Sequence, residues 1–301
     1  MSRRTTHAAD APPVTIHPAA PRVETEQFEL THAHDDGELV VRGDVYLSPG
    51  ATTGVVFSHG FKGFGRWGFY PYLAPYVAAA GLNVVTFDFS GSGIGADRQT
   101  YTDADAFARN TYTRELVDLA VVAEEARNRG WIGARYGVFG HSRGGGDAIL
   151  HTARSPDVAV LVTWAAIAHV LRWLPAEAEE WRRRGFTEVV NARTGDVMRL
   201  NVTLLEECER LSDTELNIER AAAAVTVPWF LVHGTADESV PVEDAHRLYA
   251  AAGDGSAPHV QLAILDGANH VFGGAHPLGD PPEVLRRLVA RTADFFSTHL
   301  R

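Results

Sequence analysis

The chain has 301 residues, of which 45% are hydrophobic and 22% are charged. These values are ordinary for a folded protein with its own core, and they exclude collagen-like, disordered and disulfide-scaffold classes. The single cysteine, Cys208, cannot form an internal disulfide and indicates no cysteine-rich metal site. The 27 Lys and Arg against 38 Asp and Glu give a net charge of −11, which disfavours nucleic acid and anionic membranes as partners.

Two features of the sequence bear on where the protein is located. No apolar run approaches the roughly 20 residues that a transmembrane helix needs. The N-terminus lacks the apolar core of a signal peptide, so we expect a cytoplasmic protein. Residues 1–21 are rich in Ala, Pro, Thr and Arg without apolar periodicity, and we expect a disordered tail there. We expect residues 22–301 to form one domain.

The predicted elements, in chain order, begin with a β-hairpin and continue as an alternation of strands and helices. Alternating apolar and polar residues predict the hairpin over 23–31 and 39–47, around the turn cluster His34–Gly37. Short apolar runs predict further strands at 54–58, 82–87, 136–139, 158–164, 229–233 and 260–265. Amphipathic or cap-bounded segments predict helices at 69–80, 103–128, 142–153, 176–184, 242–252 and 282–299.

Strands that alternate with helices are typical of a mostly parallel sheet that is covered on both faces. The alternation breaks between residues 165 and 225, where Trp173, Trp181 and a second hairpin candidate around Thr194–Asp196 stand out. We predict that this segment is an inserted lid above the carboxyl ends of the strands. Parallel sheets place their functional sites at that edge.

The strongest motif is the pentapeptide Gly140–Gly144, which reads GHSRG. It follows a predicted strand and precedes a predicted helix, which is the context of a nucleophile elbow. The turn of such an elbow is so sharp that a larger residue at either glycine would clash, and it holds the serine oxygen above the edge of the sheet. The sequence therefore predicts that Ser142 is a nucleophile.

A serine nucleophile needs a base, and the base needs a carboxylate that orients it. His270 ends the run DGANH after the last predicted strand, and Asp237 ends the run HGTAD after the preceding strand. The chain order Ser142, Asp237, His270 is the order found in α/β-hydrolase triads. We predict that His270 exchanges the serine proton and that Asp237 fixes its tautomer, with Asp266 and Glu238 as rival acids.

Acyl transfer also needs donors for the oxyanion of the tetrahedral intermediate. The glycine-rich run His59–Gly63 follows the strand that ends at Ser58. We expect the backbone N–H of Phe61 to bind the oxyanion together with the N–H of Arg143 in the elbow.

Five motifs together resemble the α/β-hydrolase superfamily: His59–Phe61, Asp88–Gly93, Gly140–Gly144, His233–Asp237 and Gly267–His270. Over residues from about 23 to 300, the spacing is similar to serine esterases of the cinnamoyl/feruloyl-esterase and dienelactone-hydrolase-like branch. The resemblance implies an α/β-hydrolase fold, with a mostly parallel eight-stranded sheet, helices on both faces and an inserted lid. It also implies hydrolysis of a small-molecule carboxylic ester through an acyl-enzyme, without cofactor or metal.

The resemblance carries over residue by residue to the predicted site. It assigns nucleophile, acid and base to Ser142, Asp237 and His270, and oxyanion donors to Phe61 and Arg143. It says little about the substrate. A peptidase or amidase on the same triad remains an alternative, as does a non-catalytic binding protein that kept the fold. A homodimer is left open as well.

Several other features have a functional and a structural interpretation. Gly91–Ala96 matches a dinucleotide fingerprint, but the polar residues that follow do not begin a helix, so we expect a tight turn. His32–Asp36 contains metal-binding residue types, and we expect a solvated turn there instead. Lys62, Arg66 and Arg143 could attract a substrate carboxylate or phosphate, although solvated or structurally paired cations are the favoured interpretation.

Aromatic residues gather near the predicted site and in the predicted lid. They could line a substrate pocket, but packing in the core or lid is the favoured interpretation. The residues concerned are Trp67, Phe69, Tyr70, Trp164, Trp173 and Trp181.

Overall fold

A computed structural model describes residues 20–34, 37–190, 195–253 and 257–300. Almost all of the expected tail, and the turn residues 35–36, lie outside the described residues. The centre of the fold is an eight-stranded sheet in the order β1-β2-β4-β3-β5-β6-β9-β10. Its strands are β1 (Glu24–His34), β2 (Gly37–Leu47), β3 (Gly54–Ser58), β4 (Asn83–Asp88), β5 (Tyr136–His141), β6 (Val158–Trp164), β9 (Trp229–Gly234) and β10 (Val260–Leu265).

The sheet is mostly parallel, as the sequence predicts. β1 and β2 form an antiparallel hairpin, and β2 also runs antiparallel to β4. The other six strands are parallel to one another. Their carboxyl ends therefore meet at one edge, where the loops after β3, β5, β9 and β10 come together.

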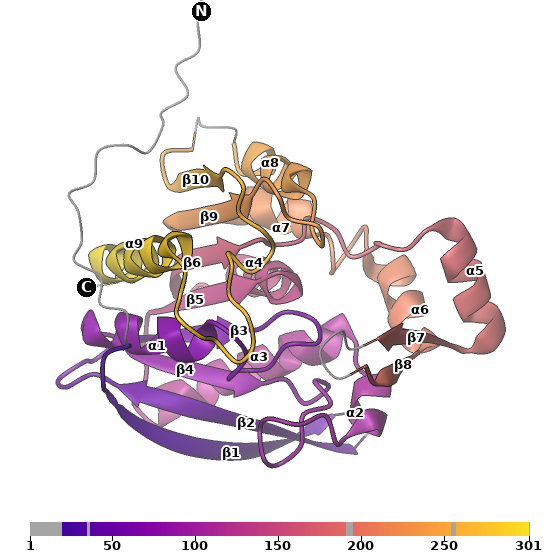
Figure 1. Cartoon of the computed structure of the whole chain (residues 1–301), viewed down its shortest axis with the longest axis horizontal. Helices are drawn as coiled ribbons and strands as arrows, with labels where there is room; N and C mark the ends of the chain where they lie inside the picture. The colour runs from indigo at the N-terminus through magenta and orange to yellow at the C-terminus, as the bar shows by residue number, and fades with distance from the viewer. Residues whose placement is uncertain (1–19, 35–36, 191–194, 254–256, 301) are drawn as a thin grey trace, which may run out of the picture.

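Helices cover both faces of the sheet (Figure 1). One face is covered by α1 (Tyr70–Ala79) and α9 (Glu283–His299), and the other by α3 (Tyr112–Asn128), α4 (Arg143–Arg154), α7 (Ile218–Ala224) and α8 (Val242–Ala251). Successive strand residues point to opposite faces, so Val55 packs with the first group of helices and Val56 with the second. Both valines are fully buried, which explains why these strands appear as continuous apolar runs.

The single helix predicted over residues 103–128 is wrong. The structure has a short α2 (Ala104–Ala108) and then α3, separated by three residues. Thr111 has an extended backbone, and its hydroxyl accepts a hydrogen bond from the N–H of Arg114 in the first turn of α3. The Asn110 amide donates a 2.7 Å hydrogen bond to Glu115. Because the Thr111 hydroxyl binds an N–H that a continuous helix would satisfy itself, Thr111 caps the start of a new helix.

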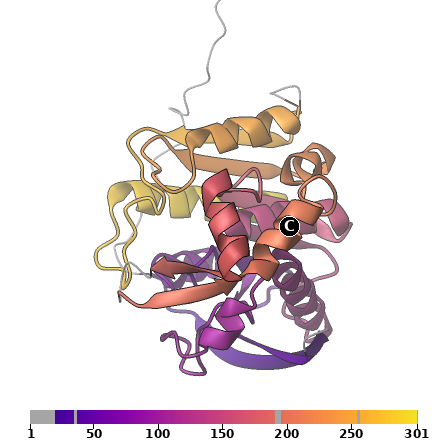
Figure 2. The same ribbon diagram turned by 90° about the vertical axis from the view of Figure 1, so that its right-hand side faces the viewer.

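The predicted insertion, residues 165–225, projects from the side of the sheet (Figures 1 and 2). It contains α5 (Pro175–Arg184), α6 (Val202–Leu211), α7 and the two-stranded antiparallel hairpin β7 (Phe186–Val190) and β8 (Val197–Asn201). Sequence analysis predicted α5 and the hairpin but not α6 or α7. Of the expected hairpin turn, Thr194 lies outside the described residues. Glu207 of α6 accepts a hydrogen bond from the backbone N–H of Thr113, which joins the insertion to the start of α3.

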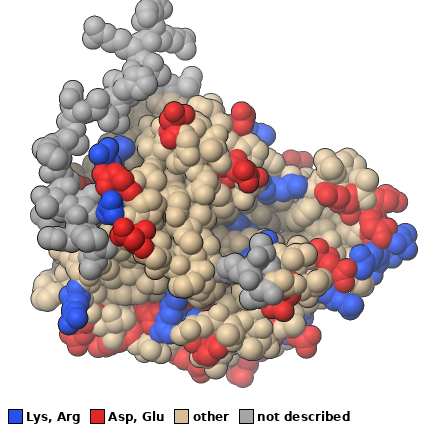
Figure 3. Space-filling model, in the orientation of Figure 1, with Lys and Arg blue, Asp and Glu red and all other residues tan. Residues whose placement is uncertain are grey.

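The charged residues of the insertion are paired on its surface. Figure 3 shows cations and acids side by side over its outer end. The three consecutive arginines of α5 form ion pairs, Arg182 with Glu209, Arg183 with Glu180 and Arg184 with Glu188. Their side chains lie on the solvated face of α5. In the part of the chain that the structure describes, no helix has the length and apolarity to cross a membrane.

Candidate active site

The turn between β5 and α4 holds Ser142 in an unusual backbone conformation. Its φ of 59° and ψ of −124° lie outside the regions that most side chains adopt. A Cβ at Gly140 would lie 2.3 Å from the carbonyl oxygen of Gly144, and a Cβ at Gly144 would lie 2.3 Å from that of His59. Both glycines of the motif are therefore sterically required, and the turn presents the serine at the carboxyl edge of the sheet.

Ser142, His270 and Asp237 form a chain of hydrogen bonds at this edge. Nε2 of His270 lies 3.1 Å from Oγ of Ser142, and Nδ1 lies 2.8 Å from Oδ2 of Asp237. An ionised carboxylate can only accept, so the His270 proton resides on Nδ1 and the bare Nε2 accepts from the serine hydroxyl. This is the tautomer that a general base for Ser142 requires.

The carboxylate of Asp237 is surrounded by hydrogen-bond donors. Its Oδ1 accepts hydrogen bonds of 2.8 Å from the backbone N–H groups of Ser239 and Val240, and its Oδ2 also lies 3.2 Å from Nε2 of His233. Burial acts to raise the pKa of Asp237, but the hydrogen bonds from His233 and His270 outweigh it and hold the pKa well below its usual range. The acid is therefore ionised at neutral pH. Neither rival, Asp266 nor Glu238, contacts His270 in this way.

The two predicted oxyanion donors are backbone amides on either side of Ser142. Arg143 is the first residue of α4, so its N–H has no acceptor within the helix. A Cβ on Gly60 would lie 2.9 Å from the Cβ of Ser142, so the peptide between Gly60 and Phe61 lies against the serine. Nδ1 of His59 donates a 2.9 Å hydrogen bond to the carbonyl of Gly60, and in a planar trans peptide the Phe61 N–H points the opposite way.

A small cavity of about 210 Å³ opens beside Ser142. Its walls come from the loop after β3, the start of α1, the elbow and the loop after β10: Gly60, Phe61, Lys62, Gly63, Trp67, Tyr70, His141, Ser142, His270 and Val271. Of the aromatic residues singled out in the sequence, Trp67 and Tyr70 line this cavity. Phe69 and Trp164 are fully buried in the core.

The two arginines near the site are held in ion pairs. The Arg66 guanidinium binds Asp44 with contacts of 2.8 and 2.6 Å. The Arg143 guanidinium lies 2.6 Å from Glu115 and 3.8 Å from the centre of the Tyr112 ring. The structure thus supports the structural interpretation for these two arginines. Lys62 lines the cavity, and its Nζ lies 3.4 Å from the carbonyl oxygen of Val190.

Comparison with known proteins shows which family the chain belongs to. The model of the prolyl oligopeptidase family matches residues 67–301. The chain belongs to the prolyl oligopeptidase family. This is a family of serine hydrolases, and the chain has the α/β-hydrolase fold, as the sequence resemblance implied.

The known proteins that resemble this member of the prolyl oligopeptidase family have low sequence identity to it. The 2,6-dihydropseudooxynicotine hydrolase of Paenarthrobacter nicotinovorans is 25% identical over 264 residues, which are 82% of this chain and 61% of that protein. Est1E from Butyrivibrio proteoclasticus superposes with a TM-score of 0.63 at 16% identity, covering 90% of this chain and 98% of Est1E. Pyrococcus horikoshii acylaminoacyl peptidase superposes at 0.64 and 19% identity, covering 92% and 42%. Both likenesses show the fold alone.

Sequence reasoning assigned no role to two buried histidines of this family member. His233 touches the acid, as described above, and its Nε2 lies 2.9 Å from the carbonyl of Val240. His59 accepts a hydrogen bond of 3.1 Å at Nε2 from the backbone of Phe89 while Nδ1 donates to Gly60. Each begins a His-Gly pair at the end of a buried strand, and this recurrence is the signal that could have identified them.

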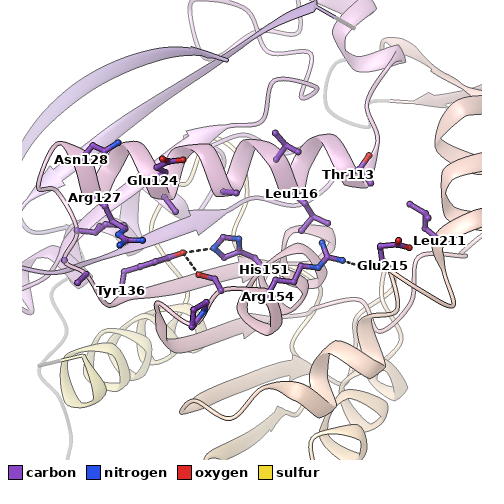
Figure 4. A pocket seen from close by; sticks show the side chains of 18 of the residues that line it. Thr113, Leu116, Glu124, Arg127, Asn128, Tyr136, His151, Arg154, Leu211 and Glu215 are labelled. Atoms are coloured by element: carbon purple, nitrogen blue, oxygen red, sulfur yellow. Dashed lines mark hydrogen bonds between the residues drawn. The ribbon is translucent and has the colours of Figure 1, made fainter. Parts of the chain in front are cut away.

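A larger hollow of about 1070 Å³ lies between α3 and α4, at the amino end of β5 and away from Ser142 (Figure 4). Its floor holds a hydrogen bond of 2.7 Å between Tyr136 and His151. Two of the arginines that line it have partners, since Arg127 pairs with Asp157 and Arg154 donates to the backbone carbonyl of Glu215. None of the predicted catalytic residues lines this larger hollow. The volume of a hollow therefore does not identify the candidate active site in this chain.

The two remaining sequence motifs, a possible dinucleotide fingerprint and a possible metal site, have structural explanations. After β4, the run Gly91–Ala96 continues through turns and an isolated bridge between Ile94 and Tyr101, and the next helix begins only at Ala104. A dinucleotide fingerprint would need a helix directly after its glycines. His32 lies 2.7 Å from Asp118, and among the described residues no group of three or more His, Cys, Asp or Glu is arranged to hold a metal.

Proposed function

We propose that the chain hydrolyses carboxylic esters with a small acyl group, using Ser142 as nucleophile, His270 as base and Asp237 as the orienting acid. The observation that carries the proposal is the continuous hydrogen-bond chain from the serine hydroxyl through the imidazole to a buried carboxylate. Est1E, which shares the fold, has also been solved with ferulic acid bound, and this supports a carboxylic ester as the substrate class.

The proposed reaction follows from the positions of these groups. His270 takes the proton of Ser142 as the serine oxygen attacks the ester carbonyl. The oxyanion that forms is stabilised by the N–H groups of Phe61 and Arg143. His270 then protonates the leaving alcohol, which gives an acyl-enzyme, and a water molecule that it activates completes hydrolysis. Asp237 holds the imidazole in the required tautomer and stabilises its cation.

The size of the cavity supports a short acyl group. Pockets that hold drug-sized ligands usually measure about 300–1,000 Å³. The cavity beside Ser142 measures about 210 Å³, and its walls include the rings of Phe61, Trp67 and Tyr70. We therefore expect acetyl and butyryl esters to be better substrates than octanoyl esters.

Replacement of the nucleophile tests the proposal. Ser142→Ala should lower kcat for p-nitrophenyl acetate and butyrate by about 10³–10⁶-fold. It should also abolish labelling by a fluorophosphonate probe while the circular dichroism spectrum is kept. Ser155→Ala, at the other end of α4, is the matched control and should retain activity and labelling. Hydrolysis that survives Ser142→Ala, or a wild-type protein that neither hydrolyses these esters nor reacts with the probe, would count against the proposal.

The family suggests a second candidate, a peptidase or amidase on the same three residues. The model that matches the chain is named for an oligopeptidase, and one structural neighbour is an acylaminoacyl peptidase. Among the residues that the structure describes, none that lines the cavity beside Ser142 carries a carboxylate to bind the free amine of a peptide. Parallel kinetics with p-nitrophenyl butyrate and with alanine and acetylalanine p-nitroanilides would separate the two. A higher kcat/KM on either anilide would favour the peptidase.

A further inference from the structure

His141 occupies the position in the elbow directly before the proposed nucleophile, Ser142. It is the last residue of β5, and its side chain lies at the same carboxyl edge of the sheet as the proposed triad. Only 5% of the residue is exposed. A buried polar ring next to a nucleophile needs a partner, because an unpaired buried donor or acceptor is unfavourable.

The partner of His141 is the backbone of the proposed base. Nε2 of His141 lies 2.9 Å from the carbonyl oxygen of His270. A carbonyl oxygen only accepts, so the His141 proton resides on Nε2 and is donated to His270. The two imidazole rings lie with their centres 4.7 Å apart, and the His141 ring also meets the ring of Phe69 at 5.2 Å in an edge-on contact. The His141 ring is therefore fixed between the core and the base.

The other hydrogen bonds near His270 do not hold its carbonyl to the elbow. The base lies in a turn after β10, outside any helix or strand. Within that turn, the N–H of Phe272 and of Gly273 bond to Asn269. The bond from His141 joins this turn to a segment 129 residues away in sequence, the segment that carries the nucleophile.

His141 can hold the base without opposing its charge. Burial, aided by the positive charge that His270 takes up, lowers the pKa of His141 to about 3. The ring is thus neutral at the pH values at which a histidine base works. No second cation forms beside the imidazolium of His270 during the reaction.

We propose that His141 is a positioning residue that anchors the carbonyl of His270 to the elbow and so keeps the His270 imidazole between Asp237 and Ser142. The inference rests on the proposed function of the triad. Displacement of a catalytic group by about 1 Å can lower a rate by roughly 10²-fold, so one hydrogen bond to the backbone of the base can matter for turnover.

Two substitutions separate the hydrogen bond from the bulk of the ring. His141→Phe keeps an aromatic ring but removes the donor, whereas His141→Gln retains an N–H donor at a similar reach. His151→Phe is the matched control, because His151 is another buried neutral histidine with one hydrogen bond, 2.7 Å to Tyr136, at the far end of α4. If His141→Phe does not fold, His141→Met provides the same comparison.

The readouts are steady-state kinetics on p-nitrophenyl butyrate and the downfield proton NMR signal of the His270 Nδ1–H, measured without substrate. His141→Phe should lower kcat by about 10–100-fold, change KM by less than about twofold and broaden or shift the downfield signal. His141→Gln should recover most of kcat and the wild-type signal. His151→Phe should lower Tm and leave both kcat and the signal unchanged.

The proposal is overturned if His141→Phe keeps the wild-type kcat and downfield signal, or if it and His151→Phe reduce kcat equally. It is also overturned if His141→Gln is as impaired as His141→Phe. The NMR signal depends on the seating of His270 and not on ester turnover. A wild-type protein that shows the signal but hydrolyses no ester would therefore refute the proposed function while the role of His141 could still be measured.

Discussion

The Oδ2 atom of Asp237 lies 2.8 Å from Nδ1 of His270, and the same carboxylate accepts hydrogen bonds from two backbone amides and approaches His233. An acid held by so many donors cannot rotate away from the imidazole or take up a proton under ordinary conditions. It fixes which nitrogen of His270 faces the serine.

Asp237→Asn should lower kcat for p-nitrophenyl esters by about 10⁴-fold, because an amide can donate to Nδ1 and so favour the wrong tautomer of His270. Stopped-flow or long-time steady-state kinetics would measure the residual rate. Asp266→Asn is the matched control, since that acid accepts only from the Thr235 hydroxyl nearby, and it should keep activity within a few-fold. A comparable loss in both variants would contradict the assignment of the acid.

Trp67→Ala should shift the acyl preference towards longer chains. The Trp67 ring lies parallel to His276, at 17°, and edge-on to Phe69, so it forms a fixed part of the cavity wall. Each methylene newly buried contributes about 0.8 kcal/mol, which is roughly fourfold in kcat/KM per carbon. A series of p-nitrophenyl esters from acetate to octanoate measures the shift. Trp131→Ala, far from the site, should leave the profile unchanged, and an unchanged profile in Trp67→Ala would refute the prediction.

His32 should make the stability of the hairpin depend on pH. The hydrogen bond to Asp118 raises the pKa of His32 above its ordinary value of 6.5, against the opposing effect of burial. A raised pKa in the folded state means that the stabilisation is fully present below the unfolded pKa of about 6.5 and is lost as the pH rises through the folded value. The excess in unfolding free energy of the wild type over His32→Gln should therefore be larger at about pH 5.5 than at about pH 9.

Urea denaturation at the two pH values would measure this difference. His246→Gln, which replaces an exposed histidine of α8, serves as the control and should show a much smaller change with pH. If the unfolding free energy of the wild type exceeds that of His32→Gln by more at pH 9 than at pH 5.5, the predicted sign of the linkage is wrong.

Asp147→Asn should stabilise the protein at neutral and alkaline pH. Asp147 is fully buried in α4, and burial, reinforced by the negative charge of Glu115, raises its pKa well above the ordinary value. The folded carboxyl keeps its proton at pH values where the unfolded chain, with a pKa of about 3.9, has released it. Stability then falls as the pH rises from about 4 towards the folded pKa, and Asn removes this dependence. Denaturation curves of the wild type and Asp147→Asn at about pH 4 and pH 8 would test this prediction. We expect Asp147→Asn to have the higher unfolding free energy only at the higher pH.

The sequence predicts best those parts that depend on short-range patterns. The strands from β3 to β10 in the central sheet are continuous apolar runs, and the elbow is set by two glycines whose Cβ atoms would clash. The break between α2 and α3 was missed because it depends on the side chains of Asn110 and Thr111, which most helices tolerate. α6 was missed although Leu204, Cys208 and Leu211 are spaced as one buried helical face.

The contacts between distant segments could not be predicted from the same patterns. The pairing of Arg143 with Glu115 and the bond from His141 to His270 join residues 28 and 129 positions apart. Each is a matter of which buried polar groups the packing brings together, and no local periodicity encodes that. The sequence already favours Asp237 over Asp266 as the acid, and the structure adds the distance of 2.8 Å between Asp237 and His270.

The segment with α5, α6 and the β7–β8 hairpin leaves the sheet after β6 and returns before β9, whereas the three proposed reacting side chains follow β5, β9 and β10. Its two attachment points are neighbouring strands, since β6 pairs with β9. Doubling a connection of this kind adds only about 0.6 kcal/mol of closure entropy. Evolution could therefore exchange or lengthen this module while the loops that carry the three proposed reacting side chains keep their places on the sheet.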